Sequence, residues 1–122
     1  MTPTQRSLKL LRDEKWVVAI VEKWNQWAKI RIDLFGFGDL LAIRDGTALI
    51  VQTTSGSNVS ARIEKIKANQ DARRWLLAPN HFIEVHGWRK VGAKGKRKLW
   101  ECREVPLFLD SCGNITENVE AL

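Results

Sequence analysis

Two apolar runs flank an Asp-Gly pair in the segment FGDLLAIRDGTALIVQTT, residues 37–54, with an aspartate near the start of one and a glutamine near the end of the other. Asp-Gly between two strand-like runs predicts a two-residue β-hairpin turn of type I′. This turn sets the register, and the pairs expected on one face are Ile43 with Ala48, Leu41 with Ile50 and Asp39 with Gln52. Opposed Cβ atoms lie roughly 5 Å apart, so a carboxylate and an amide should converge beside an apolar strip.

Before the hairpin, the pattern predicts one helix and two strand segments. Thr4 would cap a helix that ends near Asp13, with Leu8, Leu11 and Leu10 as its buried stripe. Residues 16–24 are dense in β-branched and aromatic side chains and predict a strand that is buried on both faces in its first half. Residues 30–43 resume this pattern, and the glycines at 36 and 38 indicate a bend or bulge before Asp39.

After the hairpin, the pattern changes to helical spacing. Val59, Ile63 and Ile66 stand at i, i+4 and i+7 and should pack against the sheet. Ser57 or Asn58 would cap this helix, and Asn69 would cap a second, shorter one. Residues 81–90 and 98–106 predict two strands joined by a basic, glycine-containing loop, and the polar, acidic segment from Asp110 onward should fray.

This order of elements predicts a single α/β domain. A helix between the hairpin and the fourth strand favours a mixed central sheet with helices packed against it over a β-sandwich. The length of 122 residues is enough for one core. We expect the domain to span residues 1–109, followed by a polar tail at 110–122.

The Asp39 and Gln52 pair has two interpretations. Polar pairs at strand ends are common, so the pair is explained by a cross-strand hydrogen bond. The alternative interpretation is half of a metal site, because oxygen ligands suit Mg²⁺ or Mn²⁺, and these ions need few protein carboxylates when phosphate and water supply the rest.

Composition changes this picture only in part. The net charge of +6 favours a polyanionic partner without identifying it. The two cysteines, Cys102 and Cys112, have no metal-ligand spacing, which argues against a soft-metal site. No apolar run approaches the ~20 residues needed to cross a bilayer, so we expect a cytoplasmic protein with no membrane partner.

Taken together, the segments GFGDLLAI and LIVQTT, within residues 8–105, resemble the PD-(D/E)xK nuclease superfamily, particularly its Holliday-junction resolvase-like and VRR-NUC-like branches. The resemblance implies a restriction-endonuclease-like fold in which Asp39, Gln52 and the backbone carbonyl of Thr53 bind Mg²⁺ or Mn²⁺. It also implies DNA as substrate and a homodimer. Thr54 occupies the position where the family usually has its lysine, and a hydroxyl cannot supply that positive charge. Lys65 or Arg62 of the following helix would take this role, so the expected catalytic residues are Asp39, Gln52 and Lys65.

Other ionisable residues receive ordinary interpretations. Asp33 is six residues from Asp39, about 20 Å in a straight strand, too far to share one ion unless the glycines at 36 and 38 bend the chain. Glu22 is another candidate acid of the site, but its default interpretation is an ordinary surface glutamate. His81 and His86 are expected to be packing or surface residues rather than catalytic bases.

Basic side chains are candidates for DNA contacts. Flexible cationic loops suit phosphate contacts, although a solvated loop has the same composition. The candidates are Arg62, Lys90, Lys94, Lys96, Arg97 and Lys98. Of the six tryptophans, most should be core, and Trp88 and Trp100 flank the basic loop, where base stacking competes with cross-strand packing as their explanation.

Three hypotheses follow for function. The first is a metal-dependent endonuclease that hydrolyses phosphodiester bonds of branched or structured DNA. The second keeps the fold without the chemistry, as an accessory or architectural module that binds nucleic acid. The third has no nucleic-acid partner, with the charge serving only solubility.

Overall fold

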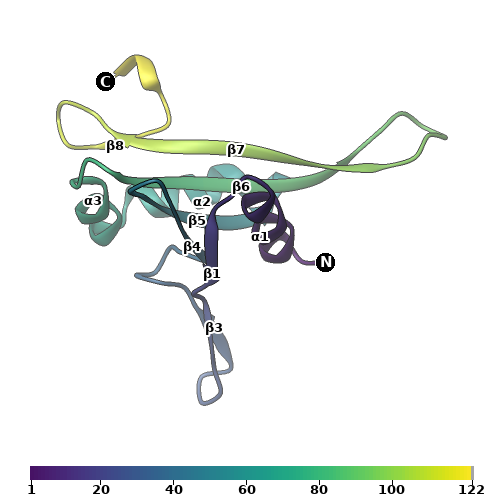
Figure 1. Ribbon diagram of the computed structural model, residues 1–122, viewed down its shortest axis with the longest axis horizontal. Coiled ribbons are helices and arrows are strands. Elements are labelled where there is room, and N and C mark those ends of the chain that lie inside the picture. The colour runs from purple at the N-terminus through teal and green to yellow at the C-terminus, as the bar shows by residue number, and fades with distance from the viewer. Residues whose placement is uncertain (122) are drawn as a thin grey trace.

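The computed structural model describes residues 1–121 (Figure 1). In chain order its elements are α1 (Pro3–Asp13), β1 (Val17–Ile20), β2 (Lys23–Asn25), β3 (Ile30–Ile32), β4 (Leu40–Arg44), β5 (Thr47–Ser55), the 3-10 turn η1 (Gly56–Asn58), α2 (Val59–Lys67), α3 (Gln70–Leu76), β6 (His81–Val91), β7 (Leu99–Leu109), β8 (Ile115–Thr116) and the 3-10 turn η2 (Val119–Ala121). In these residues no helix is both long and apolar enough to span a membrane.

The main sheet has the strand order β1-β4-β5-β6-β7-β8. β5 and β6 are parallel, and α2 and α3 form the crossover that a parallel pair requires. The other neighbours in this sheet are antiparallel. The predicted single-domain α/β architecture with a mixed sheet and flanking helices is therefore confirmed. β2 and β3 pair only with each other and project from the body as a hairpin (Figure 1).

The sheet separates two hydrophobic clusters, because side chains alternate along its strands. On β5, Ile50 packs with α2 residues Val59, Ile63 and Ile66, as their spacing predicted. Its neighbours Leu49 and Val51 pack with Leu11 of α1. α1 and α2 therefore cover opposite faces of the sheet.

The hairpin register is confirmed. Arg44 pairs with Thr47, and Leu41 pairs with Ile50. Asp45 and Gly46 have φ values of 51° and 77°, and positive φ at both central residues is the requirement of a type I′ turn. The predicted cap of α3 is confirmed too, because the Asn69 side chain accepts hydrogen bonds from the backbone of Asp71 and Ala72.

Several boundaries differ from the prediction. Thr2, not Thr4, caps α1, in a reciprocal pair of hydrogen bonds with Gln5, while Asn58 occupies the cap position of α2 without a side-chain cap bond. The segment 16–24 is not one strand buried on both faces, because β1 is an edge strand in which only Val18 is buried. The expected fraying after Asp110 is also wrong for Ile115, which pairs with Leu109 and lies in the core.

A chain of polar side chains fastens α1 to the sheet. Ser7 Oγ accepts a hydrogen bond from Trp88 Nε1 at 2.8 Å and lies 2.9 Å from His86 Nδ1. On its other side, His86 Nε2 lies 2.9 Å from an oxygen of Glu84 and 3.6 Å from one of Glu104. Because Ser7 and His86 are both fully buried, these bonds replace the water that the groups lost on folding. The prediction of His86 as a packing residue fits this position.

We expect Ser7→Ala to lower the free energy of unfolding by about 1–3 kcal/mol, because it leaves a buried nitrogen of His86 and a partly buried nitrogen of Trp88 without their partner. Urea denaturation followed by circular dichroism measures the change. Ser60→Ala, at an exposed position of α2, is the matched control. Equal effects of the two substitutions would show that the buried chain does not stabilise the fold.

Candidate functional site

Backbone hydrogen bonds place Asp39 where three strands meet. Its N–H donates to Val51 of β5 at 2.9 Å, and its carbonyl accepts from Val21, directly after β1, at 3.0 Å. The first residue of β4, Leu40, follows it. Asp39 is consequently held from both sides and is only 3% exposed.

One carboxylate oxygen of Asp39 receives three hydrogen bonds. Oδ2 accepts from Gln52 Nε2 at 2.6 Å, from Thr53 N at 2.7 Å and from Thr53 Oγ1 at 3.1 Å. The expected cross-strand approach of Asp39 and Gln52 is confirmed as a hydrogen bond. Thr53 is held in turn by Thr4 of α1, whose hydroxyl lies 2.8 Å from its own. The three bonds leave Oδ1 of Asp39 for other partners.

A tight turn brings Asp33 back beside Asp39. Leu34 and Gly38 exchange backbone hydrogen bonds of 2.8 and 2.9 Å, which folds residues 33–39 onto themselves. A Cβ atom on Gly38 would lie 2.7 Å from a methyl carbon of Ile50, so only glycine allows the turn to pack this closely on β5. The default expectation for Asp33, a separation of about 20 Å from Asp39 in a straight strand, is therefore wrong. The alternative, a bend at the glycines 36 and 38, describes the structure.

Glu22 completes a group of three carboxylates. It follows Val21, whose N–H is bonded to the Asp39 carbonyl, so the end of β1 delivers it to the same place. Glu22, Asp33 and Asp39 each offer an oxygen, and these oxygens all lie within 4.8 Å of one another. Glu22 is thus not the isolated surface glutamate that the sequence suggested. The paired glycines at 36 and 38 were the only sequence signal for this convergence.

Basic residues surround the acidic group. Arg31 Nη1 lies 3.0 Å from Glu22 Oε1, and Lys65 Nζ lies 3.6 Å from Asp33 Oδ2. Together the acidic and basic groups line a cavity of about 320 Å³, formed by Pro3, Thr4, Glu22, Arg31, Asp33, Asp39, Gln52, Thr53, Arg62 and Lys65. The structure therefore brings five predicted site residues together: Asp39, Gln52, Thr53, Arg62 and Lys65. A larger hollow of about 620 Å³ lies at the turn end of the β4–β5 hairpin, along Val17 and Ile43, away from these carboxylates.

The crowding of carboxylates changes their acidity. Burial, followed by the charge of Asp39, raises the pKa of Asp33 above its ordinary value, and Lys65 opposes this rise. Burial also raises the pKa of Asp39; the Thr53 backbone N–H opposes the rise and Glu22 adds to it. Negative charge at this site is consequently unfavourable until a cation compensates it.

The donor set suits a hard divalent cation. Mg²⁺ and Mn²⁺ prefer carboxylate and carbonyl oxygens, and the cavity supplies three carboxylates. Gln52 Oε1 is buried and has no hydrogen-bond partner among residues 1–121, and the same amide donates its N–H to Asp39. An unpaired buried carbonyl is unfavourable, so a cation or its water would relieve it. The side chain of Thr54, where the resemblance expects a lysine, is buried and neutral.

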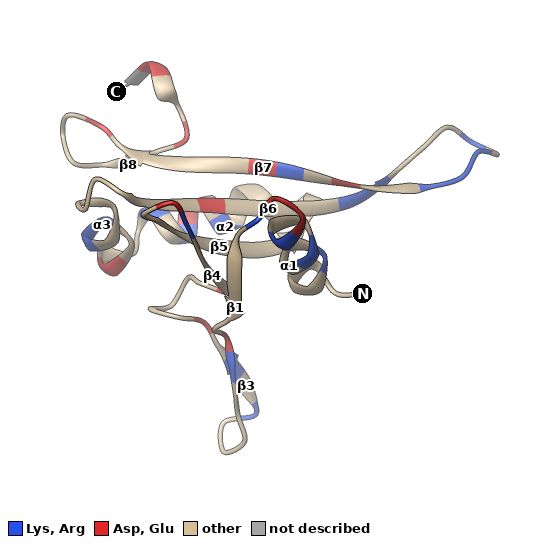
Figure 2. Ribbon diagram, in the orientation of Figure 1, with Lys and Arg blue, Asp and Glu red and all other residues tan. Residues whose placement is uncertain are grey.

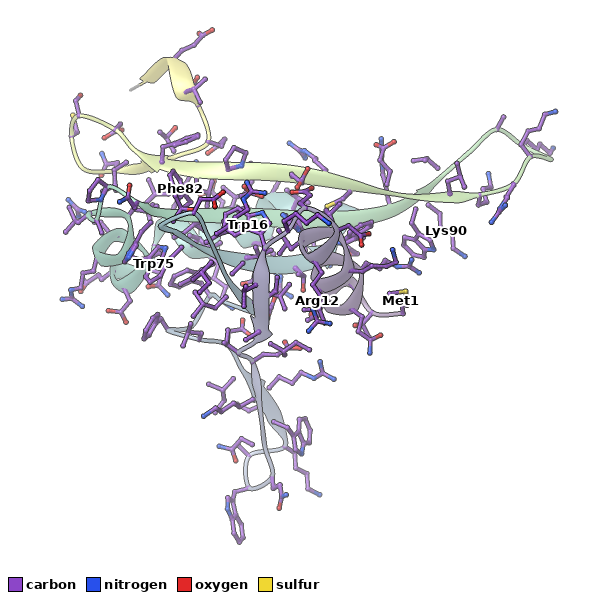
Figure 3. All side chains as sticks on the ribbon, viewed as in Figure 1. Met1, Arg12, Trp16, Trp75, Phe82 and Lys90 are labelled. Atoms are coloured by element: carbon purple, nitrogen blue, oxygen red, sulfur yellow. The ribbon has the colours of Figure 1, made fainter. Side chains whose placement is uncertain are left out.

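The remaining predicted DNA-binding residues lie elsewhere. Lys94, Lys96, Arg97 and Lys98 are in the loop between β6 and β7, at the outer end of a long hairpin (Figure 2). Lys90 lies near the N-terminal end of α1, and its Nζ is 5.4 Å from the Trp100 ring (Figure 3). The Arg6 guanidinium lies 3.8 Å from the same ring. Trp88 and Trp100 do not oppose each other, because Trp88 pairs with Cys102 and Trp100 with Lys90.

Comparisons with known proteins identify no relative. No protein-family model matches the chain, and no curated protein or solved structure is significantly similar to it. The function of the site therefore has to be argued from its own geometry.

We expect Mn²⁺ or Mg²⁺ to raise the melting temperature of the protein, because a ligand that binds only the folded state stabilises it. At ten times its dissociation constant the gain is about 1.4 kcal/mol. Differential scanning fluorimetry of the wild type, Asp33→Asn and Asp13→Asn measures the shift. Asp13 is exposed on α1, so its variant should respond like the wild type, whereas Asp33→Asn should respond less. Equal shifts in all three proteins would contradict a cation site here.

The raised pKa of Asp33 gives a second test, in cation-free buffer. A carboxylate whose folded pKa exceeds its unfolded value binds protons more tightly when folded, so stability falls as pH rises through that interval. The interval begins at the ordinary value of 3.8. Asp33→Asn removes this effect, so we expect the free energy of unfolding of the variant, relative to that of the wild type, to increase as pH rises above 3.8. Urea titrations at several pH values measure the difference, and a pH-independent or reversed difference would contradict the assignment.

Proposed function

We propose that this protein is a metal-dependent endonuclease that hydrolyses phosphodiester bonds of DNA. The observation that carries the proposal is the convergence of Glu22, Asp33 and Asp39 in one cavity with Arg62 and Lys65. Carboxylates that hold a divalent cation beside basic side chains are the groups that phosphodiester hydrolysis requires. The net charge of +6 agrees with a polyanionic substrate.

The cation would be held by carboxylate oxygens of Glu22, Asp33 and Asp39, with Gln52 Oε1 and the Thr53 carbonyl as further oxygen donors. When bound, Mg²⁺ or Mn²⁺ supplies Lewis-acid polarisation of the phosphate and lowers the pKa of a bound water. The three hydrogen bonds to Oδ2 orient Asp39, so that its other oxygen is presented in a fixed direction.

Lys65 and Arg62 would bind the phosphate. Both line the cavity, and both lie on α2, one helical turn apart. The positive charge that Thr54 cannot supply thus comes from the helix that follows the strand. A phosphate entering the cavity would compete with Asp33 for Lys65 Nζ, which is partly exposed.

The resemblance to the PD-(D/E)xK superfamily is a second support. A helix, an antiparallel three-stranded unit formed by β1, β4 and β5, a helical crossover and a parallel strand occur here in this order, with the β2–β3 hairpin inserted between β1 and β4. This is the order that the resemblance implies, with the acidic residue at the start of the second of these strands. We further propose that the protein acts as a homodimer in the cytoplasm.

An inactive module that binds nucleic acid is the second candidate. The neutral side chain of Thr54 and the pairing of Lys65 with Asp33 favour it, because together they reduce the positive charge available to the reaction. Cleavage distinguishes the two candidates, since both would bind DNA with a strong dependence on salt.

We expect the wild type to cut supercoiled, flapped or four-way DNA with Mg²⁺ or Mn²⁺, and Asp39→Asn to lose at least about 100-fold in rate, the scale on which one electrostatic catalytic group acts. Lys65→Ala should lose roughly tenfold or more, because it removes a charge-assisted contact to phosphate. Gel electrophoresis of labelled DNA measures the rates.

Lys67→Ala is the matched control for Lys65. Lys67 lies on the same helix, but it pairs with Glu117 at 2.8 Å and does not line the cavity, so its loss should leave the cleavage rate within a factor of two. DNA binding without metal-dependent cutting by the wild type would reject the nuclease and favour the inactive module.

A further inference from the structure

The hairpin formed by β2 and β3 starts and ends at the acidic cavity. Glu22 directly precedes β2, and Asp33 directly follows β3. Both residues belong to the group of three carboxylates, so the ten residues 23–32 form an arm rooted in the candidate site. The arm projects from the body of the protein, and its side chains extend on all sides of it (Figure 3).

The chemistry of this arm is basic and aromatic. Its charged residues are Lys23, Lys29 and Arg31, and it has no acidic residue. Trp27, in its turn, is 96% exposed, and Trp24 on β2 is 59% exposed. Ile30 and Ile32 are also about half exposed, at 54% and 47%. Large apolar side chains that the domain leaves uncovered on such an arm indicate a binding surface.

The turn that carries Trp27 has a defined conformation. Asn25 Oδ1 accepts hydrogen bonds from the backbone of Trp27 and Ala28, both at 3.0 Å. This arrangement closes the turn without help from the rest of the protein. Below it, Trp24 pairs with Arg31, whose guanidinium reaches Glu22. The indole is therefore presented by an ordered support that connects to the cavity.

Unpaired bases are the ligand that fits this combination. An indole stacks on the face of any base, and lysine or arginine beside it contacts the phosphates without reading sequence. Stacking needs a base whose face is not covered by its neighbours in a duplex. A partner protein would have to be acidic to suit the three basic residues, and it would leave unexplained why the arm begins and ends at a candidate phosphodiester site.

We propose that the β2–β3 hairpin binds unpaired bases at a branch or single-stranded segment of DNA, with Trp27 as the stacking residue. Resting on the proposed function, this interaction would set the substrate class, because it holds the adjoining phosphates at the cavity. The cleaved bond would then lie next to the unpaired region rather than within continuous duplex.

The test is a binding measurement that does not depend on catalysis. Fluorescence anisotropy in EDTA gives the dissociation constants of the protein for a forked DNA and for a fully paired duplex of the same length. We expect the wild type to prefer the fork and Trp27→Ala to lose about 5- to 150-fold in affinity for it, with a smaller loss on duplex. Lys29→Ala should instead weaken both DNAs to a similar degree, because phosphate contacts carry no information on base pairing.

Leu77→Ala is the matched control, since Leu77 is 72% exposed at the end of α3 and lies outside the hairpin. Its affinities should equal those of the wild type. The proposal is overturned if Trp27→Ala binds the fork as the wild type does, if it loses equally on both DNAs, or if the wild type has no preference. A preference that depends on Trp27, in a protein that cuts no DNA, would support this hairpin role and reject only the nuclease. DNA cutting by a wild type that has no preference for the fork would support the nuclease and reject the hairpin role.

Discussion

The buried carboxylate of Asp39 is the feature on which the site depends. An ionised group that is 3% exposed persists in a fold only where hydrogen bonds replace its water. Thr53 and Gln52 provide these bonds from β5, and Thr4 connects Thr53 to α1. The same position is fixed through its backbone by Val21 and Val51. Asp39 thereby connects β1, β5 and α1. The bond from Val21 to Asp39 also places the next residue, Glu22, at the cavity.

Grouping three carboxylates in one cavity costs free energy, and the packing of the rest of the domain offsets this cost. Burial raises the pKa values of Asp33 and Asp39. The charge of Asp39 adds to the rise at Asp33, which Lys65 partly compensates, and Glu22 adds to the rise at Asp39. The helical period of α2 allows this, because Ile63 and Ile66 pack on the sheet while Lys65 reaches the cavity. One face of α2 therefore stabilises the fold by packing on the sheet, and another face supplies positive charge to the cavity.

Local rules predicted what depends on local geometry. The period of two and the Asp-Gly turn gave the register that brings Asp39 to Gln52, and helical spacing gave the buried face of α2. The carboxylates of Glu22 and Asp33 could not be placed in this way. Their approach depends on the end of β1, on the turn closed by Leu34 and Gly38, and on the contact of Gly38 with Ile50, which lies twelve residues further along the chain. β8 was missed for a similar reason, because Ile115 is a single apolar residue whose partner strand is set by the fold.

The two projecting hairpins differ in chemistry, and this difference separates their physical roles. Residues 90–98, at the outer end of the β6–β7 hairpin, contain five basic and no aromatic residues, whereas residues 23–32 contain three basic residues and two tryptophans. Contacts of basic side chains with phosphates release counterions and weaken steeply with salt. Stacking and apolar contacts of tryptophan side chains persist when charges are screened. Only the second hairpin begins and ends at the acidic cavity. In the proposed function, it would therefore position the reacting phosphate, and the first hairpin would supply long-range attraction of the polyanion.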